Sequence, residues 1–371
     1  MILPEREILA LHRAIVGIPS VSGNEAELAG FLEERLRQRG ATPIRVGESL
    51  LALHGEGPVL LLDTHIDTVP SVPGWTRDPW QVESVDGRVI GLGSNDAKAS
   101  VAAMVAAFLA FQEVDLPFTL ALALVEGEET KGTGTQAILR ELSHLTIEAA
   151  VVGEPTGLDV AVAQKGLMVL ELATRGDACH AAHAAALGAT NAARLLARDL
   201  VALEEIDFGP DHPYLGPITM VPTQVQAGTA RNIVPAEATA ILDVRSTPAL
   251  PRSEIVRRIR ERVQGEVRVL SDRLLPAETP ASAAVVEAAR RSLPGVRLYG
   301  SSTMSDMAFL GDGAIKCGPG RSERSHTPDE FVLEEEVLDG ARFYTRLIGA
   351  YAELRDPAAN AAFLAAVGGA R

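Results

Sequence analysis

Two histidines and several carboxylates stand at the ends of apolar runs or in turns of this 371-residue chain. His65 and Asp67 close the run LLLDTHIDTVP, and because they are two residues apart, their side chains share one face of a predicted strand. A buried imidazole and a buried carboxylate each need a polar partner, and a metal ion would satisfy both. The alternative is a core histidine hydrogen-bonded to a neighbouring acid, which is the commoner explanation of an isolated H-x-D.

Further candidates lie at two other predicted strand ends, in a glycine-rich strand-to-helix turn and in a polar turn. They are Asp96 in GLGSNDAKAS, the adjacent Glu128 and Glu129 in LVEGEET, Glu154 in VVGEPT and His326 in SERSHTPDE. Any one of them could be a solvated acid or a helix cap. Together they supply the nitrogen and oxygen ligands that suit two zinc-like ions, with one carboxylate to bridge the ions and another left as a base.

The elements that would position these residues alternate between strands and helices. The runs PVLLLDTHI, FTLALALVEG and AAVVGEPT predict buried strands, and residues 98–112 and 135–145 predict helices. Two helices are expected over residues 4–39, the second capped by Ser22 or Asn24. The pattern favours an α/β fold with a mixed, largely parallel sheet flanked by helices, in which ligands bind at the carboxyl ends of the strands.

A different order of elements begins near Lys165. Residues 165–275 follow the order β-α-β-β-α-β, which is typical of a ferredoxin-like α+β unit. We therefore predict a catalytic domain of residues 1–164 and 276–371, interrupted by a lid or dimerisation domain of residues 165–275. The tail, residues 356–371, is interpreted as a short helix without an assigned function.

Composition narrows the class of protein. A hydrophobic content of 47% is compatible with a large core, and the net charge of −15 argues against binding to nucleic acid or to an anionic membrane surface. No uncharged apolar stretch reaches about 18 residues, so a cytoplasmic protein with small-molecule partners is expected. Cys179 and Cys317 are too few for a disulfide framework or a four-cysteine zinc site.

The motifs HIDTVP, GSNDAK, EGEE, GEPT and SHTPDE occur in one order along nearly the whole chain. That ordered set resembles the two-zinc M20 metallopeptidases and deacylases. The resemblance implies that His65 and Glu154 bind one zinc ion and that Glu129 and His326 bind the other. It also implies that Asp96 bridges the two ions. Cobalt is the alternative to zinc as the native metal.

The same resemblance implies roles for the residues around the metals. It implies that Asp67 orients the imidazole of His65 and that Glu128 is the general base acting on a metal-activated water. The reaction would be amide hydrolysis without an acyl-enzyme. Asp63 has no counterpart among the family's site residues and is interpreted as structural.

The inserted segment carries a second set of candidates. RGDACHAAH resembles the family segment whose histidine, here His180, reaches across a homodimer to stabilise the oxyanion; the alternative is an ordinary exposed strand residue. ARNIVPAEATAILDVRSTP resembles the stretch whose asparagine and arginine, here Asn232 and Arg245, hold the substrate carboxylate. A surface salt bridge is the alternative role for Arg245.

The substrate implied is an N-acyl amino acid. Gln164 and Ala308 stand where desuccinylases carry arginine, which weakens the case for a dicarboxylic acyl group. The segments GLGSNDAKAS, SSTMSDMAFL and CGPGRSERSHTPDE are closer to acetylornithine or acetylcitrulline deacetylases of arginine biosynthesis. The alternatives are a hydrolase that frees lysine or ornithine from a carrier protein, a succinyl-diaminopimelate desuccinylase, and a dipeptidase or carboxypeptidase.

Two other classes of protein fit the sequence less well. A catalytically silent binding protein is disfavoured because every metal-site and base position is filled. A flavin or nicotinamide enzyme is disfavoured because GLGSND lacks the third glycine of the dinucleotide-binding fingerprint.

Overall fold

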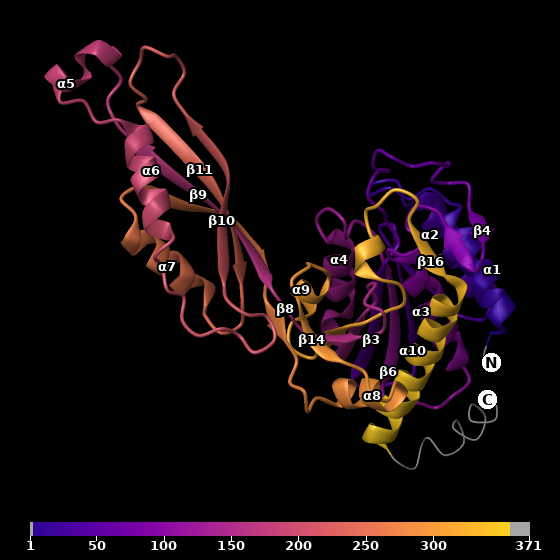
Figure 1. The fold of residues 1–371 in the computed structure, drawn as a ribbon. Helices are drawn as coiled ribbons and strands as arrows, with labels where there is room; N and C mark the ends of the chain where they lie inside the picture. Colours follow the sequence, from indigo (N-terminus) through magenta and orange to yellow (C-terminus); the bar gives the residue numbers. More distant parts are fainter. Residues whose placement is uncertain (1–2, 357–371) are drawn as a thin grey trace. The chain divides into compact units, whose positions relative to one another are not determined.

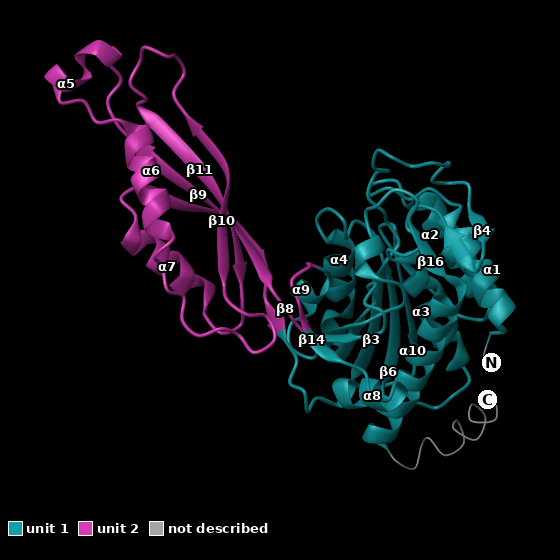
Figure 2. Ribbon diagram, viewed as in Figure 1, with its two compact units in different colours: residues 1–162, 278–299, 305–371 teal, residues 163–277, 300–304 magenta. Residues whose placement is uncertain are grey.

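The computed structural model describes residues 3–356, which fall into two compact units (Figures 1 and 2). Within the described chain, unit 1 takes the residues up to 162, residues 278–299 and those from 305 onward, and unit 2 takes residues 163–277 and 300–304. Each unit has its own cluster of buried apolar side chains. The helix expected in the tail falls on residues 357–371, outside the described part.

A large mixed sheet organises unit 1, with strand order β1-β2-β6-β3-β7-β15-β8-β13 and β14 paired to β8. Its strands are β1 (Ile44–Val46), β2 (Ser49–His54), β3 (Val59–His65), β6 (Thr119–Val125), β7 (Ile147–Val152), β8 (Val160–Gln164), β13 (Ala277–Glu278), β14 (Leu298–Ser301) and β15 (Ala314–Lys316). This is the largely parallel α/β architecture that the alternation of elements predicts.

The parallel part of the sheet brings four strand ends to one edge. β6, β3, β7 and β15 are parallel neighbours, with His65 opposite Val125 and both Asp63 and Lys316 opposite Val152. Every residue of β3 and β6 is buried, which explains their nearly uninterrupted apolar sequences. The segments that leave these four strands therefore start close together.

Helix α3 (Lys98–Ala110) is buried along its whole length. It contacts β3 and β6 on one side and α1 (Glu5–Val16) and α10 (Glu334–Arg355) on the other. Beyond Lys98 and Ser100 in its first turn the helix is apolar all round, as its enclosed position favours, and its alanines permit close packing. The remaining helices of unit 1 are α2 (Ala26–Gln38), α4 (Thr133–Glu141), α8 (Ala284–Ser292), α9 (Met307–Leu310) and the 3-10 turns η1 (Leu142–His144) and η3 (Ser322–Arg324).

A small antiparallel sheet with order β16-β5-β4 joins two distant parts of the chain. β4 (Glu83–Val85) and β5 (Arg88–Ile90) precede α3, and β16 (Phe331–Leu333) precedes α10. Phe331 pairs with Ile90. This register places Glu330 beside the turn of residues 91–96, where the amide of Gly91 donates to the Glu330 carbonyl at 3.0 Å.

The predicted cap of the second helix is wrong. The N-cap of α2 is Glu25, without a side-chain cap hydrogen bond. Ser22 instead donates from its hydroxyl to a carboxylate oxygen of Asp67 at 2.7 Å. The hydroxyl is used by a buried acid distant in sequence, which local capping rules do not consider.

Unit 2 contains an antiparallel sheet with order β10-β11-β9-β12. Its elements are β9 (Gly166–Arg175), η2 (Ala181–His183), α5 (Ala184–Leu187), α6 (Ala192–Leu203), β10 (Thr219–Ala227), β11 (Glu237–Ser246), α7 (Arg252–Arg262) and β12 (Glu266–Leu274). The order of the longer elements is the predicted β-α-β-β-α-β. Alternate residues of β9 and β11 are buried, and their apolar side chains join the same core cluster as residues of α6 and α7.

Among the residues described, every helix is too short or too polar to span a membrane.

Candidate metal centre

The candidate ligands of unit 1 lie at the carboxyl edge of the parallel strands. His65 is the last residue of β3, Glu129 lies in the turn after β6, and Glu154 follows β7. Asp96 ends the turn before α3, and its peptide bond to Ala97 is cis. His326 lies in the loop between β15 and β16. The fold thus collects five residues that are far apart in sequence.

Asp96 faces two separate groups of donors. Its Oδ1 lies 3.2 Å from His65 Nε2, which is also 3.8 Å from Glu154 Oε1. Its Oδ2 lies 3.7 Å from His326 Nε2, which is 2.9 Å from Glu129 Oε1. Within each group the possible ligand atoms lie within 4.8 Å of one another. One carboxylate therefore presents a different oxygen to each of two potential metal positions.

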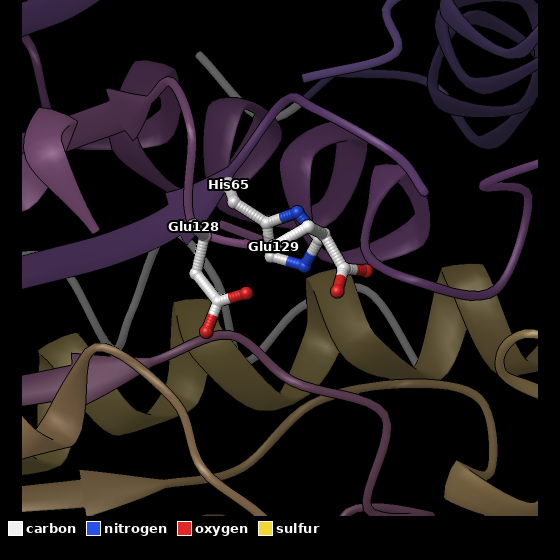
Figure 3. Close-up of side chains that lie close together, drawn as sticks. All are labelled: His65, Glu128 and Glu129. Carbon is white, nitrogen blue, oxygen red and sulfur yellow. The ribbon is translucent and has the colours of Figure 1, made fainter. Parts of the chain in front are cut away.

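The adjacent glutamates project to different sides of the site. Figure 3 shows the carboxylates of Glu128 and Glu129 on either side of the His65 ring, and the three residues also have ligand atoms within 4.8 Å of one another. Glu129 faces His326, whereas Glu128 is available for another role beside the same imidazole. Neighbouring residues of one chain can therefore serve as ligand and as base.

Asp67 supports the site in a way that the sequence does not reveal. His65 Nδ1 lies 2.9 Å from the backbone carbonyl of Asp67 and 3.5 Å from its carboxylate, so the carbonyl is the closer acceptor. The carboxylate accepts the amides of Glu128 at 3.1 Å and Glu129 at 3.2 Å, besides the hydroxyl of Ser22. Asp67 thus contacts the imidazole most closely through its backbone carbonyl, and it accepts the amides of the glutamate turn through its carboxylate.

The ionisable groups show an excess of negative charge. Burial, and then the charge of Asp96, raises the pKa of Glu154 to about 8. Burial, and then Glu154, raises the pKa of Glu128 well above its usual value. The hydrogen bond to Glu129 raises the pKa of His326 to about 9. Burial alone would lower the pKa of His65, but its carboxylate neighbours outweigh burial and raise it well above its usual value.

These observations fit two divalent cations. Carboxylates with raised pKa values beside histidines with raised pKa values mark a cluster that lacks positive charge. The Asp67 carbonyl engages Nδ1 of His65, which leaves Nε2 for a metal. Two imidazoles and three carboxylates form a donor set suited to zinc-like ions.

Two buried charged residues near the site, Lys316 and Asp306, were not among the residues predicted from the sequence. Lys316 ends β15 and is 2% exposed; burial lowers its pKa, while Glu154 and Glu128 act in the opposite direction. Burial raises the pKa of Asp306 to about 6. Lys316 follows the short apolar run GAI, whereas Asp306 follows the polar stretch SSTMS and has no comparable signal in the sequence.

Asp63, interpreted from sequence as structural, is fully buried within β3. No hydrogen bond of good geometry joins its carboxylate oxygens to another described residue, although the nearby hydroxyl of Thr135 acts to lower its pKa. Burial, and then the neighbouring Asp306, raises its pKa well above the usual value. The cluster of buried carboxyl groups around the site therefore extends into the strand itself.

The other sequence candidates belong to unit 2 and are described within it. His180 and Asn232 are exposed, and the amide of Ala181 donates to the Asn232 carbonyl at 2.9 Å, so their two segments are neighbours. Arg245 on β11 donates to both carboxylate oxygens of Asp243 at 2.8 and 3.2 Å. That pair is the salt bridge weighed as the alternative role for Arg245.

Comparison with known proteins adds a family match. The sequence model of peptidase family M20/M25/M40 matches residues 61–350, which include all five candidate ligands and Glu128. A peptidase M20 domain-containing protein of Schizosaccharomyces pombe is 28% identical over 92% of this chain and 84% of its own length. A probable carboxypeptidase of Neosartorya fischeri is 29% identical over 92% of this chain and 86% of its own length.

Solved structures show the same fold. Aminopeptidase PepT from Bacillus cereus aligns with a TM-score of 0.78 and 21% identity, covering 94% of this chain and 99% of the other. A dinuclear metal-binding peptidase of the M20 family from Bacillus subtilis aligns with a TM-score of 0.72 and 16% identity, covering 93% and 97%. At these identities the likeness establishes the architecture.

Proposed function

Because this chain belongs to peptidase family M20/M25/M40 and is therefore a metallohydrolase, we propose that it hydrolyses the amide bond of a small N-acyl amino acid at a two-metal site. The observation that carries this proposal is the carboxylate of Asp96, whose two oxygens face His65 and His326 separately. A structural ion pair would need only one of these contacts.

The donor geometry suggests how two metal ions would be held. His65 and Glu154 would bind one ion, Glu129 and His326 the other, and Asp96 both. Zinc is the proposed metal, with cobalt as the alternative. When bound, such ions supply Lewis acidity and increase the acidity of a water molecule.

Glu128 is proposed as the general base. It lies beside the imidazole of His65 without being needed in either donor group around Asp96. Its raised pKa suits a carboxylate that takes a proton from water and returns it to the leaving amine. Asp67, by accepting the amides of Glu128 and Glu129, would keep the base and its neighbouring ligand in their separate orientations.

N-acetylornithine and N-acetylcitrulline are the proposed substrates, in a cytoplasmic reaction of amino-acid biosynthesis. Ala308 is buried within α9 and offers no charged group to a dicarboxylic acyl chain. Asn232 and Arg245 are proposed to bind the substrate carboxylate. His180 is proposed to stabilise the oxyanion in the partner subunit of a homodimer formed through residues 165–275.

A carboxypeptidase or dipeptidase is the second candidate. It is favoured by the probable carboxypeptidase of Neosartorya fischeri, which is 29% identical over 92% of this chain. Both candidates cleave an amide next to an amino acid with a free carboxylate; the first removes an acetyl group, whereas the second removes an aminoacyl or peptidyl group.

The deciding experiment measures release of free amine from N-acetylornithine, N-acetylcitrulline, N-succinyl-diaminopimelate and simple dipeptides, with and without a chelator. Chelator-sensitive cleavage of an acetyl amino acid would support the first candidate, and cleavage of dipeptides alone would support the second. Protein that contains two metal ions and cleaves none of these compounds would overturn the proposal.

A further inference from the structure

Glu330 is a buried carboxylate that accepts three backbone amides of one turn. Its Oε1 accepts the amides of Asn95 and Asp96, each at 2.9 Å, and its Oε2 accepts the amide of Gly93 at 3.0 Å. The residue is 2% exposed and lies at the entrance to β16, whose pairing with β5 holds it beside the turn. One side chain thus holds the backbone N–H groups of Gly93, Asn95 and Asp96.

The same turn is tied to the loop that carries His326. Asn95 Oδ1 accepts the amide of Arg321 at 2.8 Å, and its Nδ2 donates to the Arg321 carbonyl at 3.1 Å and to Ser325 Oγ at 3.3 Å. His326, the next residue, has a left-handed backbone with φ of 59°. Such a conformation in a non-glycine residue persists where surrounding contacts impose it.

We propose that Glu330 is a positioning residue that directs the bridging carboxylate of Asp96 and so sets the affinity of the protein for both metal ions together. The inference rests on the proposed two-metal function. Asp96 must present one oxygen to each donor group, which requires its backbone to be held in one orientation. Release of the turn weakens the single ligand that the two ions share, whereas loss of Glu154 or His326 would weaken one position.

The variant Glu330→Gln tests this role because an amide has one acceptor oxygen. The glutamine side chain cannot accept from Gly93 on one side and from Asn95 and Asp96 on the other, and its NH2 group would oppose a backbone N–H. Residues that support metal ligands commonly change metal affinity by about 10–100-fold when substituted. We expect a loss of that size at both metal positions.

Unit 2 offers a matched control in Asp199. This residue is 3% exposed, and its carboxylate oxygens accept the amides of Gln264 at 3.0 Å and Gly265 at 2.8 Å. Asp199→Asn removes the same kind of contact, between a buried carboxylate and backbone amides, but in unit 2, which contains none of the candidate metal ligands. We expect it to lower the melting temperature without changing metal affinity.

The measurement is a titration of the metal-free, full-length protein with Zn²⁺ against a competing chelator, for wild type, Glu330→Gln and Asp199→Asn. The inference predicts weaker binding of both ions in Glu330→Gln, and kcat that recovers at saturating Zn²⁺ with little change in KM. Unchanged affinity in Glu330→Gln, or weakening of one ion alone, would overturn it. Wild-type protein that fails to bind two ions would instead refute the proposed function.

A second variant distinguishes the position of the Glu330 carboxylate from its charge, and it can be tested even if Glu330→Gln does not fold. Glu330→Asp keeps the charge and both oxygens but shortens the side chain by one methylene, so it cannot reach all three amides. Weaker binding of both ions supports positioning. Wild-type affinity in Glu330→Asp would show that charge alone matters and would overturn the inference.

Discussion

In unit 1 two turns that carry candidate ligands are held by buried carboxylates through backbone amides, whereas in unit 2 the side chains of His180 and Arg245 contact near neighbours in sequence. Asp67 fixes the turn of Glu128 and Glu129, and Glu330 fixes the turn of Asp96. In unit 2, His180 Nδ1 accepts the amide of Ala182, and Arg245 binds Asp243.

This difference corresponds to two requirements of catalysis: metal ligands that are fixed in advance, and substrate-binding residues that can change partners. Metal ligands must stand in place before the ion arrives, because the ion imposes strict distances on all its donors at once. Residues that bind a substrate can exchange local partners for the substrate when it binds. Substitutions in the two units should therefore change different measurable quantities.

The largest effect is expected from Glu128→Gln in unit 1. The variant keeps the size of the side chain but removes the general base, which typically contributes about 10²–10⁴-fold to the rate. We expect kcat to fall by that factor while two metal ions remain bound, measured by amine release and by metal analysis. Turnover within a few-fold of wild type would show that another group is the base.

His180→Ala in unit 2 should reduce kcat by about 10²–10³-fold, the usual cost of losing one oxyanion donor. Metal content should remain that of the wild type, because His180 is exposed and forms no part of the donor groups around Asp96. A variant with full activity would remove His180 from the mechanism.

Mixing the His180→Ala and Glu128→Gln proteins tests whether His180 acts on the partner subunit. If it does, half of the sites in each mixed dimer contain both residues, and random exchange should restore about one quarter of wild-type activity. No recovery after proven subunit exchange would place His180 in its own subunit's site.

Arg245→Ala should mainly raise KM, by about 10–100-fold, because a charge-assisted contact to a carboxylate contributes about 1.5–3 kcal/mol. Steady-state kinetics with the best substrate of the panel would measure the change. Asp243→Asn is the matched control: it removes the local salt bridge but leaves the guanidinium, so KM should change little. Equal effects of the two variants would assign Arg245 to the surface pair alone.

The smallest expected effect concerns His12, which is buried in unit 1 with Nε2 2.8 Å from the Ser94 carbonyl. Burial lowers its pKa from 6.5 to about 4, so the unfolded chain binds more protons between these values. Its contribution to stability is full above pH 6.5 and declines as the pH falls toward 4.

Denaturant unfolding of the metal-free protein should therefore show a loss of about 1 kcal/mol between pH 6.5 and 5.5 that is absent from His12→Gln. Glutamine can still donate to the Ser94 carbonyl, so the comparison isolates the titration. A variant with the same pH dependence as wild type would contradict the assignment.

Local sequence pattern was sufficient to predict many of the secondary-structure elements and the types of the candidate ligands. Apolar runs bounded by polar residues are properties of short segments, so the strands β3, β6 and β7, the alanine-rich helix α3 and the ferredoxin-like order of unit 2 follow from the sequence. The chemical types of the ligands at the strand ends were equally readable, because a polar residue that closes an apolar run is conspicuous.

Tertiary structure decided which atoms meet. That Asp96 turns one oxygen to His65 and the other to His326 depends on loops about 230 residues apart. The roles of Ser22, Asp67 and Glu330 rest on hydrogen bonds to distant partners, chiefly backbone amides, and backbone amides carry no signature in a sequence. The sequence specifies the chemical type of each side chain. The partner of a buried polar group depends instead on how the whole unit packs.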